Sequence, residues 1–588
     1  MPRGVGGVAA IVVAPYSDCF LSHMSVREPF RLASPFWLVA WAVALAWCWL
    51  LPNHYLPWSA FHMDAWAAAA LLPIAAAVVW RTRGETRVSV SFVLVLGLSA
   101  LPWLQHAVGL ITVAGTAWVA FAYLFGLGLA ILVGQRWERH SPDQLGDGLC
   151  LAIALSAMLS VGLQLHQWLR LDLIEIWSMG NGFGRPYANF GQPNQLGTLL
   201  LWGILALGWG ALRGQIRPAV LVVGIAYLLF GVALTASRTA WLGLLLLVLA
   251  VWYWRALWPW RPTPWVATGL AMVFFVYVWI IPIAAQALFL GTGEAGIDDL
   301  VRVSSELRPQ AWVLFLDAIW HKPWSGYGWS QTSMAQLAVS LDHPPLGIVF
   351  AHAHNLILDL LLYCGVPLGL FILGVLAIWL WRRFHAIKDA TSALLFLFLV
   401  VIGNHAMLEF PLHYAYFLLP AGLVMGALDT RLTGRMVRFG QRWIAGVMWL
   451  ASALLLSVMV RDYLRVEASY QALRFEWANF RTNNLRAPPD VLLLDQLRDM
   501  IIFARFEPSS GMSPEQLDWM RRVAGLYPNA GTVHKLATAL VWNNQPDEAV
   551  LWFRRMCTMV PQSQCMAIRN ALKKQAESDP RIAAVFWP

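Results

Sequence analysis

Histidine is the side chain best suited to accept a proton near neutral pH, and one histidine of this sequence precedes a long apolar segment. His354 belongs to the run His352-Ala353-His354-Asn355, directly before that segment. A helix N-terminus carries partial positive charge, which disfavours an imidazolium and keeps an imidazole neutral. His354 is therefore predicted to act as a general base.

The histidines of this region also allow two other interpretations. The first is a structural role for His354 as a cap of the helix. A metal site formed with His343, His405 or His413 is the second interpretation, but no third ligand stands at a readable zinc-site spacing and the HExxH motif is absent from the sequence. We therefore expect no metal.

An arginine stands in the short turn Thr235-Ala236-Ser237-Arg238-Thr239, which is predicted to face outwards. Placing Arg238 there opposes the usual preference of positive charge for the cytoplasmic side. A guanidinium offers phosphate a fixed fork of donors and stays charged at working pH. Arg238 is therefore predicted to bind an anion, the alternative being an arginine that anchors its helix at the membrane interface.

The stretch 185–195 is rich in side-chain amides and leads into an apolar segment. It contains Arg185, Asn189, Gln192, Asn194 and Gln195. Amides donate and accept hydrogen bonds, which suits sugar hydroxyls and phosphate oxygens. The alternative is a hydrogen-bonded turn at the start of a helix.

Two further polar stretches are predicted to face the same side. The turn 404–414 carries Glu409, His413 and Tyr414, and the loop 289–354 carries Arg302, Glu306 and Arg308. Arg308 is predicted to start an amphipathic helix on the membrane surface. Guanidiniums, a neutral imidazole, a carboxylate and amides together suit transfer from a pyrophosphate-linked donor.

The elements that must position these residues are transmembrane helices. The chain of 588 residues is 59% hydrophobic and only 12% charged, which excludes a water-soluble globular protein and a disordered chain. The fold class predicted is all-α, because open strands cannot satisfy their backbone in lipid. Thirteen spans are predicted: 34–52, 65–80, 89–106, 108–133, 146–168, 195–213, 217–236, 239–256, 265–288, 355–382, 390–408, 413–428 and 441–461. The segment 65–80 is short and is predicted to be tilted or re-entrant.

The distribution of Lys and Arg predicts the orientation. With a cytoplasmic N-terminus, nineteen fall on the cytoplasmic side and six on the other, the tail not counted. The predicted domains are a cytoplasmic segment (1–33), transmembrane helices 1–9 (34–288), a large periplasmic loop with catalytic residues (289–354), transmembrane helices 10–13 (355–461) and a periplasmic helical domain (462–588). The net charge of +9 is explained mostly by topology, so no nucleic-acid partner is expected.

The tail is predicted to be a soluble helical domain. The pattern from His534 to Pro561 resembles one tetratricopeptide-type hairpin, and a plain helical domain is the alternative. Cys557 and Cys565 share the tail, where either a disulfide or two buried thiols is expected.

Several of these residues resemble a known family. His354-Asn355, followed after nine residues by Gly365, together with Arg238 and Leu242, resembles the O-antigen ligase and polymerase superfamily of bacterial inner membranes. The stretch 184–198 looks like the signature of PglL-type protein O-oligosaccharyltransferases, the pilin glycosylation ligases. The tail is similar to the C-terminal domain of that branch. One departure is Leu368, where the superfamily pattern has Gly, Thr or Tyr.

The resemblance implies a bacterial inner-membrane enzyme with a periplasmic active site. Its donor would be an oligosaccharide on undecaprenyl diphosphate, and its acceptor a Ser or Thr of a periplasmic protein such as pilin. His354 would accept the hydroxyl proton, and Arg238 and Arg308 would hold the departing diphosphate without a metal or other cofactor. The predicted substrate-binding residues are Arg185, Asn189, Gln192, Asn194, Gln195, His352, Asn355, Glu409, His413 and Tyr414.

Two other functions stay open. The same chemistry with a glycan acceptor would make the protein an O-antigen ligase or polymerase. The second alternative is a transporter of the lipid-linked sugar. Transporters often contain inverted repeats with Gly- or Pro-broken spans at corresponding positions, and the sequence shows no such pairing.

Overall fold

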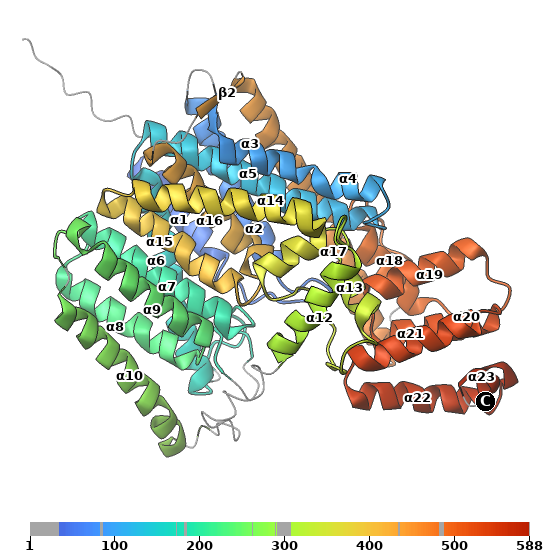
Figure 1. The fold of residues 1–588 in the computed structure, drawn as a ribbon. Coiled ribbons are helices and arrows are strands. Elements are labelled where there is room, and N and C mark those ends of the chain that lie inside the picture. The colour runs from blue at the N-terminus through green and yellow to red at the C-terminus, as the bar shows by residue number, and fades with distance from the viewer. Residues whose placement is uncertain are drawn as a thin grey trace, which may run out of the picture.

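The computed structural model describes residues 34–82, 86–171, 173–180, 185–261, 263–288, 290, 307–432, 436–440, 442–480 and 487–586. These residues form a bundle of apolar helices, with a group of shorter helices at one end (Figure 1). The segment 1–33 and the residues Gly184, Arg302 and Glu306 of the sequence analysis lie outside the described residues.

The helices of the bundle overlap the predicted spans. They are α1 (Pro35–Trp47), α2 (Phe61–Arg81), α3 (Val90–Ser99), α4 (Leu101–Ala107), α5 (Ala114–His140), α6 (Gln144–Trp168), α7 (Pro193–Leu212), α8 (Pro218–Leu234), α9 (Arg238–Tyr253), α10 (Pro264–Ala287), α14 (Leu356–Ala386), α15 (Ala390–Ala406), α16 (Ala415–Arg431) and α17 (Arg442–Trp477). Helices α3 and α4 share the predicted span 89–106, and α17 extends beyond the predicted end at 461. Short 3-10 turns follow α9 and precede α16, at Arg255–Leu257 and Pro411–His413.

Eight candidate spans among the described residues are long and apolar enough to cross a membrane, counting Val90–Ala107 as one. The apolar helices α1, α8, α9 and α15 are shorter, so the count of thirteen spans stays a prediction. The expectation that the segment at 65–80 is short is wrong, because α2 has 21 residues. The sequence analysis placed its start too late, since Phe61 and Met63 are also buried helical residues.

Close packing of two helix backbones holds the centre of the bundle together. A Cβ atom at Gly134 of α5 would lie 2.2 Å from the carbonyl oxygen of Leu423 in α16. A Cβ at Gly426 of α16 would lie 2.1 Å from the carbonyl oxygen of Ile131. Small residues permit such approach between membrane helices, where packing rather than hydrophobicity drives association.

The all-α class is confirmed, with one small addition. The strands β1 (Thr86–Ser89) and β2 (Met436–Gly440) pair antiparallel into a two-stranded ribbon. They precede α3 and α17, so the ribbon joins two distant parts of the chain at one end of the bundle. The sequence analysis missed it because such short strands leave little periodic signal.

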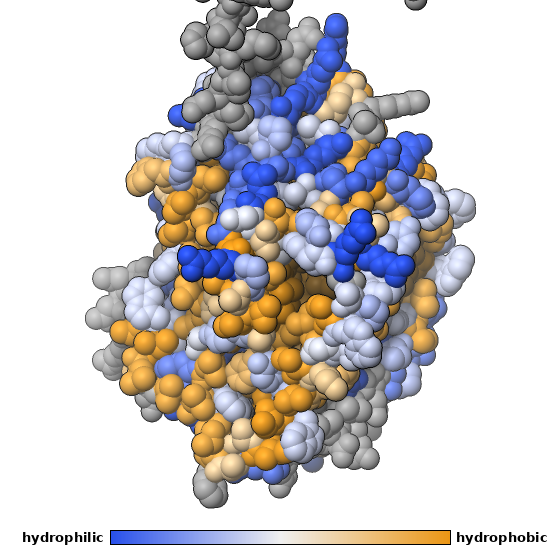
Figure 2. Space-filling model, turned by 90° about the vertical axis from the view of Figure 1, so that its left-hand side faces the viewer, coloured by the Kyte–Doolittle hydropathy of each residue, from blue (hydrophilic) through white to orange (hydrophobic). Residues whose placement is uncertain are grey.

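Polar side chains gather on one part of the bundle end that lies away from the C-terminal helices. Figure 2 views this end, where hydrophilic side chains gather over the upper part of a face that is otherwise largely apolar. It carries ion pairs, among them Arg383 with Asp429 (2.6 Å) and Arg431 with Glu138 (2.7 Å). The distribution of Lys and Arg predicts that this end faces the cytoplasm.

Helix α14 is broken at Gly365, and the break fixes the segment before it. Gly365 has φ 74° and ψ 172°. The loop at Pro323 fills the break: Val366 donates its N–H to the carbonyl of Pro323 (2.6 Å), and Tyr327 donates to that of Leu362 (2.7 Å). The first half of α14 is thereby held to the segment that contains α12 (Leu307–His321) and α13 (Thr332–Val339).

The C-terminal part is helical, as predicted. It comprises α18 (Asp495–Arg505), α19 (Pro514–Leu526), α20 (Ala530–Trp542), α21 (Pro546–Met559), α22 (Gln562–Ala576) and α23 (Pro580–Phe586). Helices α20 and α21 pack together where the hairpin was predicted, and their core includes Leu536, Leu540 and Met556. Its assignment as a tetratricopeptide repeat stays a prediction.

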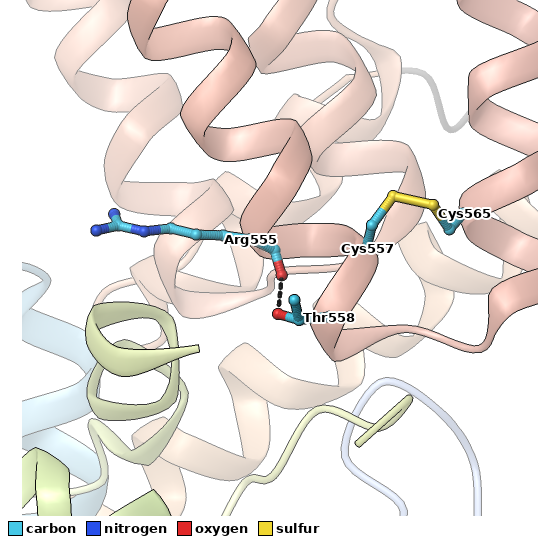
Figure 3. Close-up of a disulfide and its surroundings, with 4 residues drawn as sticks. All are labelled: Arg555, Cys557, Thr558 and Cys565. Atoms are coloured by element: carbon cyan, nitrogen blue, oxygen red, sulfur yellow. Dashed lines mark hydrogen bonds between the residues drawn. A yellow bond between two sulfur atoms is a disulfide. The ribbon is translucent and has the colours of Figure 1, made fainter. Parts of the chain in front are cut away.

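A disulfide closes the junction between α21 and α22. Cys557 and Cys565 are bonded, which decides between the two alternatives left open by the sequence (Figure 3). Next to it, the carbonyl of Thr558 accepts hydrogen bonds from the N–H groups of Leu346 (3.1 Å) and Gly347 (3.2 Å). The C-terminal helices are therefore docked on the loop that leads to His354.

Candidate functional site

The carboxylate of Glu409 is the centre of a polar cluster. Its Oε1 pairs with the guanidinium of Arg308 and accepts a hydrogen bond from Nδ2 of Asn194 (2.9 Å). Its Oε2 accepts one from Nε2 of Gln192 (3.2 Å) and lies 3.7 Å from Nε2 of His354. Glu409 is only 3% exposed, so these partners replace its water.

The cluster forms where four described helices begin. Asn194 lies in the first turn of α7, and its Oδ1 accepts from Oγ of Ser237, the N-cap of α9 (2.7 Å). Arg308 is the second residue of α12, and His354 directly precedes Asn355, the N-cap of α14. Helix N-termini carry partial positive charge and free N–H groups, so this region favours an anion.

Three arginines contribute to the same region. Arg185 donates from Nη1 to the carbonyl of Ala236, the residue before the cap of α9 (3.0 Å). Burial lowers the pKa of Arg185, the positive charges of Arg238 and Arg308 lower it further, and Glu409 raises it. The three guanidiniums and one carboxylate leave an excess of positive charge, which suits a multiply charged anion.

His354 makes a defined hydrogen bond beside this cluster. Its Nδ1 lies 3.0 Å from the carbonyl oxygen of His352, which can only accept, so Nδ1 carries the proton and Nε2 keeps a lone pair. Burial lowers the pKa of His354, Glu409 raises it, and Arg308 lowers it. The neutral imidazole and its role as a base stay predictions, and burial, more than the helix N-terminus, favours the neutral form. His354 has φ 57°, a left-handed conformation rare for a residue with a side chain.

The other predicted amides continue the cluster inwards. Gln195 donates from Nε2 to Oε1 of Gln192 (2.8 Å), and its Oε1 accepts from the hydroxyl of Tyr416 (2.7 Å). Tyr414 also hydrogen-bonds Gln195. Gln192, Gln195 and Tyr414 are therefore linked in one network that ends on Glu409.

Comparison with known proteins adds to this geometry. The chain matches the family model described as O-Antigen ligase over residues 223–373, that described as Protein glycosylation ligase over 186–209, and that described as Virulence factor membrane-bound polymerase, C-terminal, over 393–574. It is 30% identical over 533 residues to a General O-oligosaccharyltransferase of Acinetobacter baylyi, covering 87% of this chain and 90% of the relative. A ComP-specific O-oligosaccharyltransferase of the same organism is 25% identical over 449 residues, covering 74% and 78%.

The chain belongs to the PglL-type O-oligosaccharyltransferases of the O-antigen ligase superfamily. It is thus a multi-pass membrane enzyme, a glycosyltransferase that takes a lipid-linked glycan as donor and a protein as acceptor. These matches therefore support the interpretation as an enzyme over that as a transporter.

The three matched segments of this oligosaccharyltransferase meet at Glu409. Gln192 and Asn194 lie in the glycosylation ligase segment, Arg308 and His354 in the O-antigen ligase segment, and Glu409 in the polymerase segment. Leu368, where this chain departs from the family pattern, is 36% exposed.

Asn189 lies apart from this network. Its Oδ1 accepts from the N–H of Met179 (3.0 Å), and its Nδ2 donates to the carbonyls of Leu50 (2.7 Å) and Trp177 (2.8 Å). Its side chain is fully buried. In the structure Asn189 therefore holds the oligosaccharyltransferase loop that precedes α7, which corresponds to the structural alternative for this stretch.

His352, Asn355 and His413 lie beside the base. Asn355 caps α14 and donates from Nδ2 to the carbonyl of Met407 (3.1 Å), which ties the two turns together. The rings of His352 and His413 are 3.8 Å apart. Burial lowers the pKa of His352 well below its usual value and that of His413 to about 4.

Three side chains of the enzyme are placed so that they could hold a metal ion. Ligand atoms of His352, Asp359 and His413 lie within 4.8 Å of one another. Asp359 is, however, already an acceptor for the N–H of Ala353 (2.7 Å), and Nδ1 of His352 lies 3.3 Å from the hydroxyl of Tyr363. Of the histidines considered as further ligands, His343 pairs with Asp317 (2.9 Å) and His405 with Thr198 (2.8 Å).

The sequence analysis missed the residues that support the network. Gln167 of α6 accepts at Oε1 from the N–H groups of Tyr187 (3.1 Å) and Ala188 (2.8 Å), and donates from Nε2 to Ala188 (2.6 Å). Gln105 of α4 bridges the carbonyl of Tyr363 (2.7 Å) and the N–H of Trp329 (2.9 Å). A glutamine inside an apolar segment is the signal that would have found both.

Proposed function

We propose that the enzyme transfers an oligosaccharide en bloc from undecaprenyl diphosphate to Ser or Thr hydroxyls of periplasmic proteins such as type IV pilin. The observation that carries this proposal is the position of a neutral His354 beside a carboxylate that is surrounded by arginines and helix N-termini. A base and an anion site next to each other are what attack by a hydroxyl and departure of a diphosphate require.

In the proposed reaction the hydroxyl oxygen of the acceptor attacks the anomeric carbon of the first sugar. Nε2 of His354 takes the hydroxyl proton, and the bond between the anomeric carbon and the phosphate oxygen breaks. The diphosphate keeps that electron pair, and Arg185, Arg238 and Arg308 balance its charge. Glu409 stabilises the imidazolium that forms 3.7 Å away.

Co-expression with a lipid-linked glycan pathway and a candidate pilin tests the proposal. Intact mass of the pilin should increase by the mass of the whole glycan. An increase by a single sugar, or none, would refute en bloc transfer. Modification of a lipid A core or growth of a polysaccharide instead would identify the alternative with a glycan acceptor.

The anion role of Arg238 can be tested by Arg238→Lys. Lysine keeps the charge but loses the fork of donors, so transfer should fall roughly 10- to 100-fold while the enzyme still inserts. The matched control is Arg217→Lys at the N-cap of α8, which is exposed and lies at the opposite helix end from the turn with Arg238. Equal activity of both variants, measured at equal enzyme abundance, would reduce Arg238 to an interfacial anchor.

We further propose that the transfer is metal-independent, because guanidiniums take over the charge neutralisation that a divalent ion often supplies. Chelator in the assay with purified enzyme should leave the rate unchanged. Inhibition that is reversed by added divalent ion would contradict this, and the variant Asp359→Asn would then locate the metal at the His352–Asp359–His413 cluster.

The site and the C-terminal helices are proposed to be periplasmic. The asymmetry of Lys and Arg supports this orientation, as does the disulfide, since disulfides persist in oxidising compartments. A reporter that is active only in the cytoplasm should be silent when fused after residue 588 and active after residue 388. Activity of the first fusion would mean that the number of spans is wrong by one.

A further inference from the structure

A cavity of about 410 Å³ adjoins the site on one side. His352, Phe410, His413 and Tyr414 form its wall towards the site. The ring of Phe410 lies 4.9 Å from that of His354 and 4.5 Å from that of His352, so a single aromatic residue connects the base with the cavity. A group bound in the cavity would therefore lie next to the proton acceptor.

The opposite wall comes from the C-terminal part of the chain. Gln496 and Leu497 of α18 line it, and the loop at 57–60 and the first turns of α5 complete it. Asp495 accepts a hydrogen bond from the N–H of Gly115 (2.6 Å), which fixes α18 against the start of α5. The cavity is thus formed between the membrane helices and the C-terminal helices.

The lining has no charged side chain among the described residues: no Lys, Arg, Asp or Glu contributes to it. A diphosphate needs cations, so the donor phosphates belong on the arginine side and not here. The volume is in the range of sites for small ligands, and aromatic rings of Trp58, Phe410 and Tyr414 offer flat apolar contacts.

The glutamine of α18 offers no free acceptor to the cavity. Gln496 is 8% exposed, and its Oε1 packs on Gly115 at the start of α5. Only uncharged polar groups and apolar rings therefore face a ligand, and the hydroxyl that reacts must reach His354 beside the cavity. An uncharged polypeptide segment fits both the polarity and the location of the cavity.

We infer that this cavity, which we name the acceptor cavity, binds the uncharged stretch of the acceptor polypeptide that flanks the reacting hydroxyl. The inference rests on the proposed function. It assigns the two sides of His354 to the two substrates: the diphosphate on the side of Glu409 and the arginines, and the polypeptide on the side of Phe410 and α18.

Steady-state kinetics of the purified full-length enzyme, with lipid-linked glycan and acceptor protein varied in turn, test the inference. Ser59 is exposed and lines the cavity, so Ser59→Phe should fill the space without disturbing the core. It should raise KM for the acceptor protein by about tenfold or more and leave KM for the donor unchanged.

The matched control is Ser510→Phe, at an exposed residue of the C-terminal part that does not line the cavity. A photo-crosslinking residue at position 59 of the His354→Ala enzyme should form an adduct with the acceptor protein, independently of turnover. An unchanged acceptor KM in Ser59→Phe, a raised donor KM, or adducts with the lipid-linked glycan would each overturn the inference and leave the proposed function standing. If the wild-type enzyme modifies no protein, the proposed function itself fails, and the inference with it.

Discussion

Replacing His354 with alanine is expected to lower transfer about 10²- to 10⁴-fold, because a Ser or Thr hydroxyl is a weak nucleophile until a base accepts its proton. The lone pair on Nε2, the donation from Nδ1 to the carbonyl of His352 and the nearby Glu409 are the features on which this expectation depends. The measurement is the amount of glycosylated acceptor at equal enzyme abundance. Robust transfer by His354→Ala would rule out the proposed base.

His352→Ala is the control for the general effect of losing an imidazole here. This variant should lose less transfer activity than His354→Ala, since His352 stacks on His413 instead of facing Glu409.

The pH dependence of transfer gives a second test of the base. The base must be neutral, and burial holds its pKa below the ordinary value, so the rate should be constant down to about pH 6.5 and decline only as the pH falls through the lowered pKa. A decline that begins well above pH 6.5 would contradict the neutral resting state.

Gly365→Ala is expected to abolish transfer and to lower the thermal stability of the protein. At φ 74° a side chain strains the backbone by about 1–3 kcal/mol. Moreover, the added Cβ would lie 2.6 Å from the carbonyl carbon and oxygen of Trp324, so the loop that fills the break in α14 would have to move. That loop and the first half of α14 position Asn355 and His354.

Gly374→Ala is the matched control in the same helix, because a Cβ at Gly374 meets nothing within 4 Å. Alanine favours a helix over glycine by up to about 1 kcal/mol, so this variant should be as stable as the wild type or more so. Thermal unfolding in detergent and the transfer assay should separate the two variants. Equal stability and activity would mean that the break in α14 does not position the site.

The membrane helices were predictable from the sequence because lipid leaves a long chain few options. A spanning segment must satisfy its backbone internally and expose apolar side chains, so helices such as α7 and α14 follow from composition alone. The ends of α2 and the ribbon of β1 and β2 could not be predicted from composition, because they depend on contacts with distant segments of the chain. Helix ends are the least certain part of any such prediction.

The residues of the candidate site could be selected from the sequence, but their contacts with one another could not be predicted. His354, Arg308 and the amides at 192–195 could be selected as polar groups that no lipid-facing role explains. Their meeting at Glu409 could not be predicted, because these contacts bring together the starts of three helices, α7, α12 and α14, that are far apart in the sequence. Asn189 illustrates this limit. It is an amide side chain like the neighbouring Gln192 and Asn194, and only its full burial and its three backbone partners show that it holds the loop.

The hydrogen bonds from Leu346 and Gly347 to Thr558 impose an order on the biogenesis of the enzyme. The ribosome makes the loop that leads to His354 long before it makes α21, so this loop receives its last backbone partner only when nearly the whole chain has been synthesised. Thr558 also directly follows Cys557, whose pairing with Cys565 needs an oxidant. A nascent chain thus inserts its helices before the loop that leads to His354 has all its partners, and the enzyme matures at its C-terminus last.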